Sequence, residues 1–320
     1  PVYSGLPARR SFTAADIVTA LGNDVGNYFA AISTDRYHPT FVPGGDITMS
    51  KTDTPERCAR AALGKASPSA RAVLLVANAE HGADQPGGMG SAGVGCPDTA
   101  VTGCPASQSQ RWAYVGAVDF APDRIAHPPL DLIEHEIGHT IGWVHSGTAE
   151  GTGVEGVYDS ALDVMSNSAA PRSVDPSRRD APDTLAIDRL ISGWIGLDRT
   201  VTITGEADVH LTPSNTRTTD KEGRSVKGDF VLILPAGRSA FVTVEALTNT
   251  GFDSHLPASG VAVHTITTKR GEIYRVVPEF GAPPFNQLLG DGARVEASGW
   301  TVAVTRIADG SFSVHVRRQQ

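Results

Sequence analysis

The sequence lacks the features that mark several common classes of protein. Its longest unbroken apolar run is Ala72–Ala77, far short of the ~20 apolar residues that a membrane-spanning helix needs, so no membrane span is expected. Lysine and arginine number 27 against 35 acidic residues, a net charge of -8, and they form no basic stripe. Because nucleic-acid binding depends on clustered positive charge, no nucleic-acid partner is expected. The sequence contains neither a Gly-x-Ser-x-Gly nucleophile elbow nor a phosphate-binding loop.

Cysteines are also few, with only three in the chain. Cys96 and Cys104 bracket a short segment rich in turn-forming residues, Pro97–Gly103, which favours a disulfide that closes this loop. Such a disulfide would indicate an oxidising compartment. The alternative is three thiols in a reducing compartment. Cys58 lies in a helix-like segment, where a small buried residue is the simplest interpretation.

The length of 320 residues favours two domains. Helices and strands alternate over the first part of the chain, with amphipathic helices expected at 13–33, 55–65 and 184–194 and strands at 71–78 and 112–120. From residue 198 onward, short β-rich segments follow one another, separated by turn signals such as Pro235-Ala236-Gly237. We therefore predict an α+β domain over 1–197 with a mixed sheet, and an all-β, sandwich-like domain over 198–320. The chain begins Pro1-Val2-Tyr3, with no initiating Met or leader, which favours a mature or trimmed form.

One segment carries a specific chemical signal: His135-Glu136-Ile137-Gly138-His139-Thr140-Ile141-Gly142-Trp143-Val144-His145. Two histidines four positions apart lie one turn above the other on the same face of a helix. Their imidazoles can therefore reach one zinc ion. Glu136 directly follows the first ligand, so its carboxylate sits beside the metal and can take a proton from a zinc-bound water.

The residues after this helix complete the predicted site. Pro128 and Pro129 suit its first turn, and Gly142 can end it in a left-handed conformation. His145 can then swing back as a third ligand. Three protein ligands leave one position open for water, which distinguishes a catalytic zinc site from a structural one. A helix with satisfied surface histidines and a glycine cap is the alternative.

The extended motif resembles that of the metzincin zinc metallopeptidases. These peptidases also carry a Met-turn beneath the metal. Met165, in Asp163-Val164-Met165-Ser166, is the only methionine after the motif and is therefore the candidate. An ordinary core methionine is the alternative interpretation of Met165.

Two further strings resemble secreted peptidases of the gametolysin and immune-inhibitor-A type. One is Glu155–Ser166, and the other is Thr184–Trp194 with its closing Gly-Trp. A weaker similarity extends over Glu245–His264, so that the resemblance covers residues 11–320 in outline.

The chain departs from the family pattern at two places. Some metzincins have a tyrosine two residues after the methionine as a switchable ligand, but Asn167 stands there, so no tyrosine ligand is assigned. Tyr158, before the methionine, is a weaker alternative. Ser166 stands where the gametolysin pattern favours glycine. In the glycine-rich stretch 82–95 and just beyond it, Asp84 and Asp98 could hold calcium through their oxygens, although solvated loop carboxylates are the simpler interpretation.

The resemblance implies a secreted zinc-dependent endopeptidase that hydrolyses peptide bonds in protein or peptide substrates. Zinc bound by His135, His139 and His145 would polarise the scissile carbonyl, and Glu136 would activate the zinc-bound water. Two alternatives remain. One is an adhesion protein in which the zinc domain is a scaffold and the β domain binds glycan or protein. The other is a zinc hydrolase of a different substrate, such as an amide in cell wall.

Overall fold

The computed structural model describes residues 2–4, 12–50, 52–77, 88–91, 111–116, 127–148, 158–216, 230–306 and 312–319. The chain divides into two compact units. Unit 1 comprises Pro1–Phe29, His38–Trp143 and Ser177–Asp180, and unit 2 comprises Ala30–Tyr37, Val144–Pro176 and Ala181–Gln320. Helices and several sheets are both present, so the fold is α+β, as expected. The expected domain boundary after residue 197 stays a prediction.

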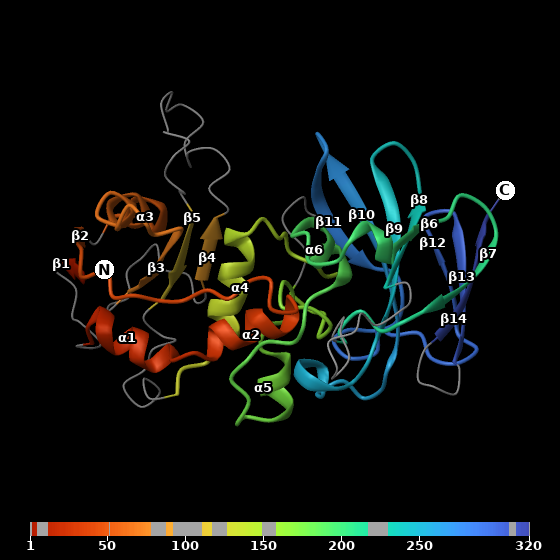
Figure 1. Cartoon of the computed structure of the whole chain (residues 1–320), viewed down its shortest axis with the longest axis horizontal. Helices are drawn as coiled ribbons and strands as arrows, with labels where there is room; N and C mark the ends of the chain where they lie inside the picture. Colours follow the sequence, from red (N-terminus) through yellow and green to blue (C-terminus); the bar gives the residue numbers. More distant parts are fainter. Residues whose placement is uncertain are drawn as a thin grey trace. The chain divides into compact units, whose positions relative to one another are not determined.

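The elements before residue 144 are labelled in Figure 1. They are β1 (Val2–Ser4), α1 (Ala14–Leu21), α2 (Asp24–Ile32), β2 (Thr48–Ser50), α3 (Pro55–Leu63), β3 (Ala72–Val76), β4 (Gly88–Ser91), β5 (Arg111–Val115) and α4 (Asp131–Thr140). The short strands β1 and β2 pair with each other in parallel.

The single helix expected over residues 13–33 is in fact two. Gly22 has a φ of +54°, outside the helical region, and separates α1 from α2. The start of α1 agrees with the sequence, since Thr13 and Asp16 form a capping box. Asp16 N–H donates to Thr13 Oγ1 at 3.2 Å, and Thr13 N–H donates to the Asp16 carboxylate at 2.7 Å. These two bonds give partners to backbone N–H groups that have no partner within the helix.

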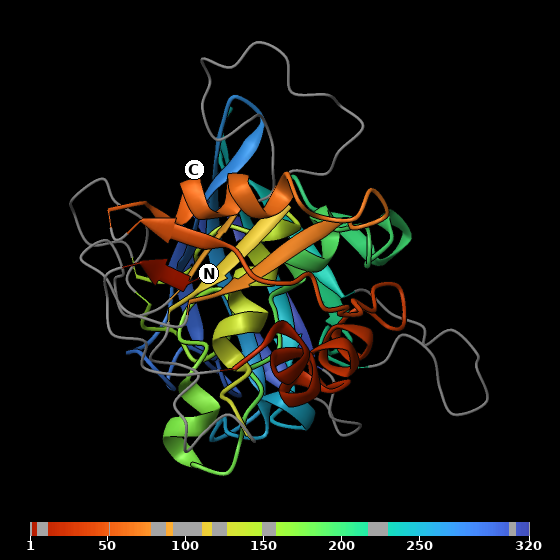
Figure 2. The ribbon, with the colours of Figure 1, turned by 90° about the vertical axis from the view of Figure 1, so that its left-hand side faces the viewer.

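A three-stranded mixed sheet, in the order β3-β5-β4, forms the centre of unit 1. β5 pairs in parallel with β3 and antiparallel with β4, which confirms the expected mixed sheet. Side chains alternate between the faces of a strand. Trp112 and Tyr114 of β5 therefore share one face, where they pack with Cys58 of α3. α3 and α4 cover opposite faces of this sheet (Figure 2).

The elements after residue 143 are mostly strands. They are α5 (Ala170–Val174), α6 (Ala186–Ile191), the 3₁₀ turns η2 (Leu197–Arg199) and η3 (Gly251–Asp253), β6 (Thr200–Thr202), β7 (Ala207–Leu211), β8 (Val231–Pro235), β9 (Ala240–Leu247), β10 (Gly260–Lys269), β11 (Glu272–Pro278), β12 (Arg294–Ala297), β13 (Trp300–Arg306) and β14 (Phe312–Arg318).

Two sheets of unit 2 share one apolar core. The first has the order β11-β10-β9-β8-β6 and the second β12-β13-β14-β7. Alternate residues of both sheets meet in one cluster, with Val242 and Val244 from β9 facing Val302 and Val314 from β13 and β14. Two sheets around a common core agree with the sandwich-like arrangement expected for residues 198–320.

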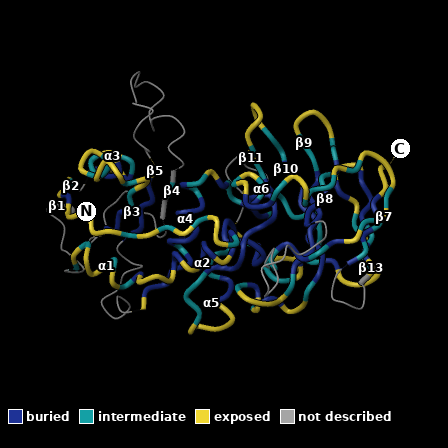
Figure 3. The backbone as a smooth tube through the Cα atoms, viewed as in Figure 1, coloured by how far each residue is buried: buried dark blue, intermediate teal, exposed yellow. Residues whose placement is uncertain are grey.

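Burial follows the same elements. Most residues of β9, β10 and α4 are buried, whereas β7, β11 and β12 include exposed residues, as the colours of the tube in Figure 3 show. None of the described helices has the length and apolar character needed to cross a bilayer.

Candidate functional site

Helix α4 carries the two histidines of the motif, and its start is fixed by backbone contacts. The N–H groups of Leu130 and Asp131 both donate to the carbonyl of Arg179, at 2.8 and 2.9 Å. These bonds take the place of a side-chain cap, which this helix lacks. Because α4 begins at Asp131, Pro128 and Pro129 precede its first turn, which corrects the position expected for them.

The end of α4 follows the expectation from sequence. Gly142 has a φ of +99°, a region that favours glycine. Its N–H donates to the carbonyl of His139, and Trp143 N–H donates to that of Gly138, both at 3.1 Å. This bond pair is a Schellman motif. It turns the chain sharply out of the helix, in the direction of His145.

The ring of His139 is oriented by the same turn. Its Nδ1 lies 2.9 Å from the backbone carbonyl of Trp143. A carbonyl oxygen only accepts, so Nδ1 carries the proton and Nε2 keeps its lone pair available for a metal. The rings of His135 and His139 lie edge to face, with 4.9 Å between their centroids.

The three motif histidines come together. One ring nitrogen of each of His135, His139 and His145 lies within 4.8 Å of the others. Residues 135–145 form one uninterrupted described stretch, in which helix spacing brings His135 and His139 together and the turn at Gly142 leads the chain to His145. Among the described residues, no second group of His, Cys, Asp or Glu meets this spacing. Three imidazoles are a donor set that suits zinc.

Glu136 lies on the same helix and is 3% exposed. The strand next to it comes unusually close. A Cβ on Gly90 of β4 would collide with the carbonyl oxygen of Glu136, and would lie 2.6 Å from His139 Cβ and 3.1 Å from Glu136 Oε2. Gly90 pairs with Ala113, so two of the smallest residues lie side by side where β4 and β5 meet α4.

The role of Gly90 was not visible in the sequence. The stretch 82–95 reads as an irregular glycine-rich loop, whereas residues 88–91 form β4. A lone glycine within a strand can mark a close approach of another backbone, and this is the signal that could have identified Gly90.

The segment after His145 is anchored within unit 2. Ser146 N–H donates to the carbonyl of Met165 at 3.1 Å, and Ser146 Oγ donates to Asp163 Oδ2 at 2.5 Å. The half-exposed Tyr158 packs edge-on against the His145 ring, with its hydroxyl 3.1 Å from Nε2.

Met165 is fully buried, in a tight turn whose hydrogen bonds use Ser166. Ser166 N–H donates to the carbonyl of Asp163 at 3.0 Å, and Ser166 Oγ accepts the N–H of Ser160 at 3.0 Å. A glycine at 166 could not supply this hydroxyl, so the side chain of Ser166 contributes directly to the turn. Asn167 donates its N–H to the carbonyl of Ser160.

Unit 2 also contains five buried carboxyl groups that the sequence did not single out as a site: Asp163, Asp183, Asp188, Glu245 and Asp253. Burial is the largest cause that raises each pKa, to about 6 for Asp163 and about 7 for Glu245, and well above the ordinary value for Asp188 and Asp253. Burial also raises the pKa of Asp183, against the opposing charge of Arg189. We call these five side chains the carboxyl cluster.

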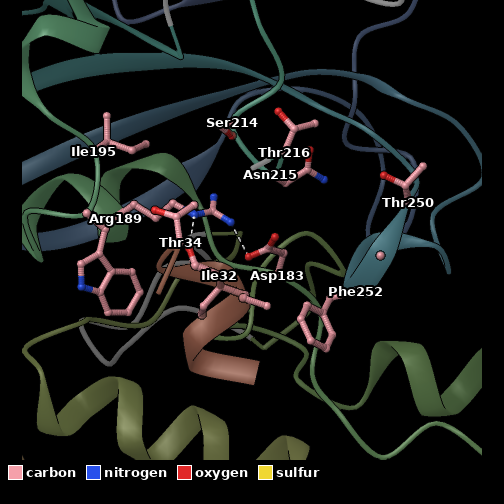
Figure 4. Close-up of a pocket in the computed structure, with 13 residues that line it drawn as sticks. Ile32, Thr34, Asp183, Arg189, Ile195, Ser214, Asn215, Thr216, Thr250 and Phe252 are labelled. Atoms are coloured by element: carbon pink, nitrogen blue, oxygen red, sulfur yellow. Dashed lines mark hydrogen bonds and ion pairs between the residues drawn. The ribbon is translucent and has the colours of Figure 1, made fainter. Parts of the chain in front are cut away.

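Arg189 is the buried cation of this region (Figure 4). It pairs with Asp183 and donates to the backbone carbonyls of Thr184, at 2.6 Å, and Ile32, at 3.0 Å. Asp183 and Arg189 line a small cavity of about 160 Å³. Nε, Nη1 and Nη2 of Arg189 each have a hydrogen-bond partner, so the guanidinium has little capacity left to bind a ligand.

Several expected sites cannot be placed. Cys96 and Cys104, and the candidate calcium ligands Asp84 and Asp98, lie outside the described residues. Cys58 is buried on α3, as expected.

The chain was compared with protein-family models, with curated proteins and with solved structures. No family model, no curated protein and no solved structure matches it.

Proposed function

We propose that this chain is a secreted zinc-dependent endopeptidase of the metzincin type, with a catalytic domain over 1–197 and an accessory β domain over 198–320. The proposal is carried by one observation: one ring nitrogen of each of His135, His139 and His145 lies within 4.8 Å of the others, and the buried Glu136 directly follows the first of these residues. The secreted location depends on the family resemblance and on the expected disulfide between Cys96 and Cys104.

Each residue of the motif has a role in hydrolysis. His135, His139 and His145 hold the metal, and the carbonyl of Trp143 keeps His139 in the required tautomer. When bound, zinc supplies Lewis-acid polarisation of the scissile carbonyl and makes a water more acidic. The carboxylate of Glu136 accepts the proton of the attacking water and later delivers it to the leaving amine.

Strand β4 favours a peptide substrate over a small amide. Among the described strands, β4 pairs only with β5, so its other edge has backbone groups that an extended chain can pair with. Gly90 brings this strand close to Glu136, as its missing Cβ would meet the glutamate. A peptide added alongside β4 would therefore run near the general base.

Zinc content and casein cleavage test the proposal together. The wild-type chain should hold about one zinc and lose cleavage when a chelator removes it. Glu136→Gln should keep the zinc and lose about 10²–10⁴-fold in cleavage rate, because only proton transfer is removed. Glu272→Gln, at an exposed glutamate of β11, is the matched control.

Histidine variants test the ligand assignment. His139→Ala should lose zinc, whereas His210→Ala, at an exposed histidine of β7, should keep it. Loss of zinc in Glu136→Gln would contradict the role given to Glu136. Bound zinc without any peptide cleavage would instead favour the scaffold alternative.

A further inference from the structure

Asp163 is a fully buried carboxyl group that the proposed reaction does not use. Its two oxygens are placed by neighbours from separate segments of unit 2. Ser146 Oγ donates to Oδ2 at 2.5 Å, and Thr184 Oγ1 lies 3.2 Å from Oδ1. The backbone N–H groups of Met165 and Leu185 also hydrogen-bond to this carboxyl group. Asp163 is therefore held rigidly.

Ser146 connects Asp163 to the backbone next to His145. Three bonds hold residues 146 and 147: the side-chain bond to Asp163, the bond from Ser146 N–H to the Met165 carbonyl, and a bond of 3.1 Å from Gly147 N–H to the Val276 carbonyl. The residue directly before this anchored segment is His145.

His145 needs such support more than its two partners do. His135 and His139 are positioned by the regular geometry of α4, and His139 also by the carbonyl of Trp143. His145 lies beyond the helix, past a left-handed glycine, in backbone that belongs to no helix or strand. Its position therefore depends on the bonds that hold the residues around it and on the Tyr158 ring that packs against it.

We propose, on the basis of the proposed zinc site, that Asp163 is a positioning residue for the third ligand, acting through the hydroxyl of Ser146. The pair keeps the His145 imidazole at a spacing that one metal ion can bridge. His145, Ser146, Asp163 and Thr184 belong to the same compact unit, so the contacts that support the backbone next to His145 lie within that unit.

The chain offers a closely matched pair of variants. Ser146 and Thr184 are both 1% exposed, and each places a hydroxyl against the Asp163 carboxyl group. Only Ser146 adjoins a ligand. Ser146→Ala and Thr184→Val each remove one hydroxyl with little change in volume, so both should lower the melting temperature. A purely structural role of Asp163 would make their effects on metal binding equal.

The test is the zinc dissociation constant of the full chain, measured by competition with a chromophoric chelator. Ser146→Ala should weaken zinc binding about tenfold to hundredfold, the range for lost support of a metal ligand, and Thr184→Val by less than about twofold. The visible absorption of the cobalt-substituted protein should change in Ser146→Ala and not in Thr184→Val. Asp163→Asn, which replaces one acceptor oxygen with a donor, should resemble Ser146→Ala.

The inference is overturned if Ser146→Ala binds zinc as tightly as the wild-type chain, or if Thr184→Val weakens binding equally. Casein cleavage by the wild-type chain separates this result from the proposed function. Zinc affinity that depends on Ser146, in a chain that cleaves nothing, supports positioning and refutes the peptidase. Cleavage with equal zinc affinity in both variants supports the peptidase and refutes positioning. A wild-type chain that binds no zinc refutes both.

Discussion

The histidines of the motif and the carboxyl cluster both gather ionisable side chains within the protein, but in different ways. The histidines come from one uninterrupted stretch of chain, and one ring nitrogen of each lies within 4.8 Å of the others. The carboxyl groups come from positions between 163 and 253, and they are neutralised by Arg189, by hydroxyl and amide donors and by their own protons. The first group is suited to receive a cation, and the second has no need of one.

The two groups also differ in how the free-energy cost of burying their side chains is offset. An ionised carboxylate removed from water must be paired or protonated. Asp183 has Arg189, and Glu245 accepts bonds from Ala186 N–H, at 2.9 Å, and from Ser214 Oγ. A neutral imidazole has no charge to compensate, so its burial costs less than that of an ionised carboxylate.

Removal of the cation that pairs with the carboxyl cluster should have the largest effect on stability. Arg189→Met should cost about 3–5 kcal/mol of unfolding free energy, because it leaves buried Asp183 without its partner. Urea unfolding measures this, and zinc affinity should change little. Arg294→Met is the control, since Arg294 pairs with Glu296 on the surface and is 56% exposed. An exposed pair contributes about 0–1 kcal/mol, so equal losses in both variants would refute the special role of Arg189.

A second prediction concerns pH. Folding raises the pKa of Glu245 from 4.5 to about 7, chiefly through burial, so folding favours its neutral form. This stabilisation is fully present below pH 4.5 and is lost as the pH rises through 7. The loss should amount to roughly 2–3 kcal/mol between pH 5 and pH 8. Urea unfolding at pH 5 and pH 8 measures the pH dependence of stability.

A matched variant isolates the part due to Glu245. Burial lowers the pKa of His264 to about 4, which acts in the opposite direction below pH 6.5. The informative quantity is therefore the difference between variants. Glu245→Gln, which cannot ionise, should flatten the pH dependence, whereas Glu272→Gln should preserve it. An unchanged slope in Glu245→Gln would show that Glu245 is ionised throughout.

The smallest expected effect concerns the turn at Gly142, which ends the helix that carries two of the motif histidines. Gly142→Ala should cost about 1–2 kcal/mol, because a residue with a Cβ is strained at a φ of +99°. No atom lies within 4 Å of the added carbon, so the cost is purely one of backbone conformation. Gly44→Ala is also free of contacts and has no left-handed φ, and should change thermal stability by less than about 0.5 kcal/mol. Equal melting temperatures for both variants would contradict the strain argument.

The parts of the site that the sequence predicted are the local ones. Helix spacing predicts the proximity of His135 and His139, and the glycine preference for left-handed backbone predicts the turn at Gly142. The turn signal Pro235-Ala236-Gly237 likewise predicts the break between β8 and β9. Each of these depends on a few neighbouring residues alone.

The parts that the sequence did not predict depend on distant partners. β7 and β11 are strands with exposed polar residues, and their pairing with β14 and β10 is what fixes them. The burial of Asp253 follows from bonds to Asp183 N–H, at 3.0 Å, and to Asn215, at 2.7 Å, both far away in the chain. An aspartate in a turn gives no local sign that such partners exist.

The burial of Cys58 has a consequence for observing the motions of unit 1. Its thiol has 0% exposure in the layer between α3 and the sheet, where Trp112 and Tyr114 pack. A thiol reagent can reach such a sulfur only when that layer opens, so the rate of its modification under native conditions counts opening events. The modification rate of Cys58 therefore reports how often local unfolding occurs on the side of the sheet opposite α4.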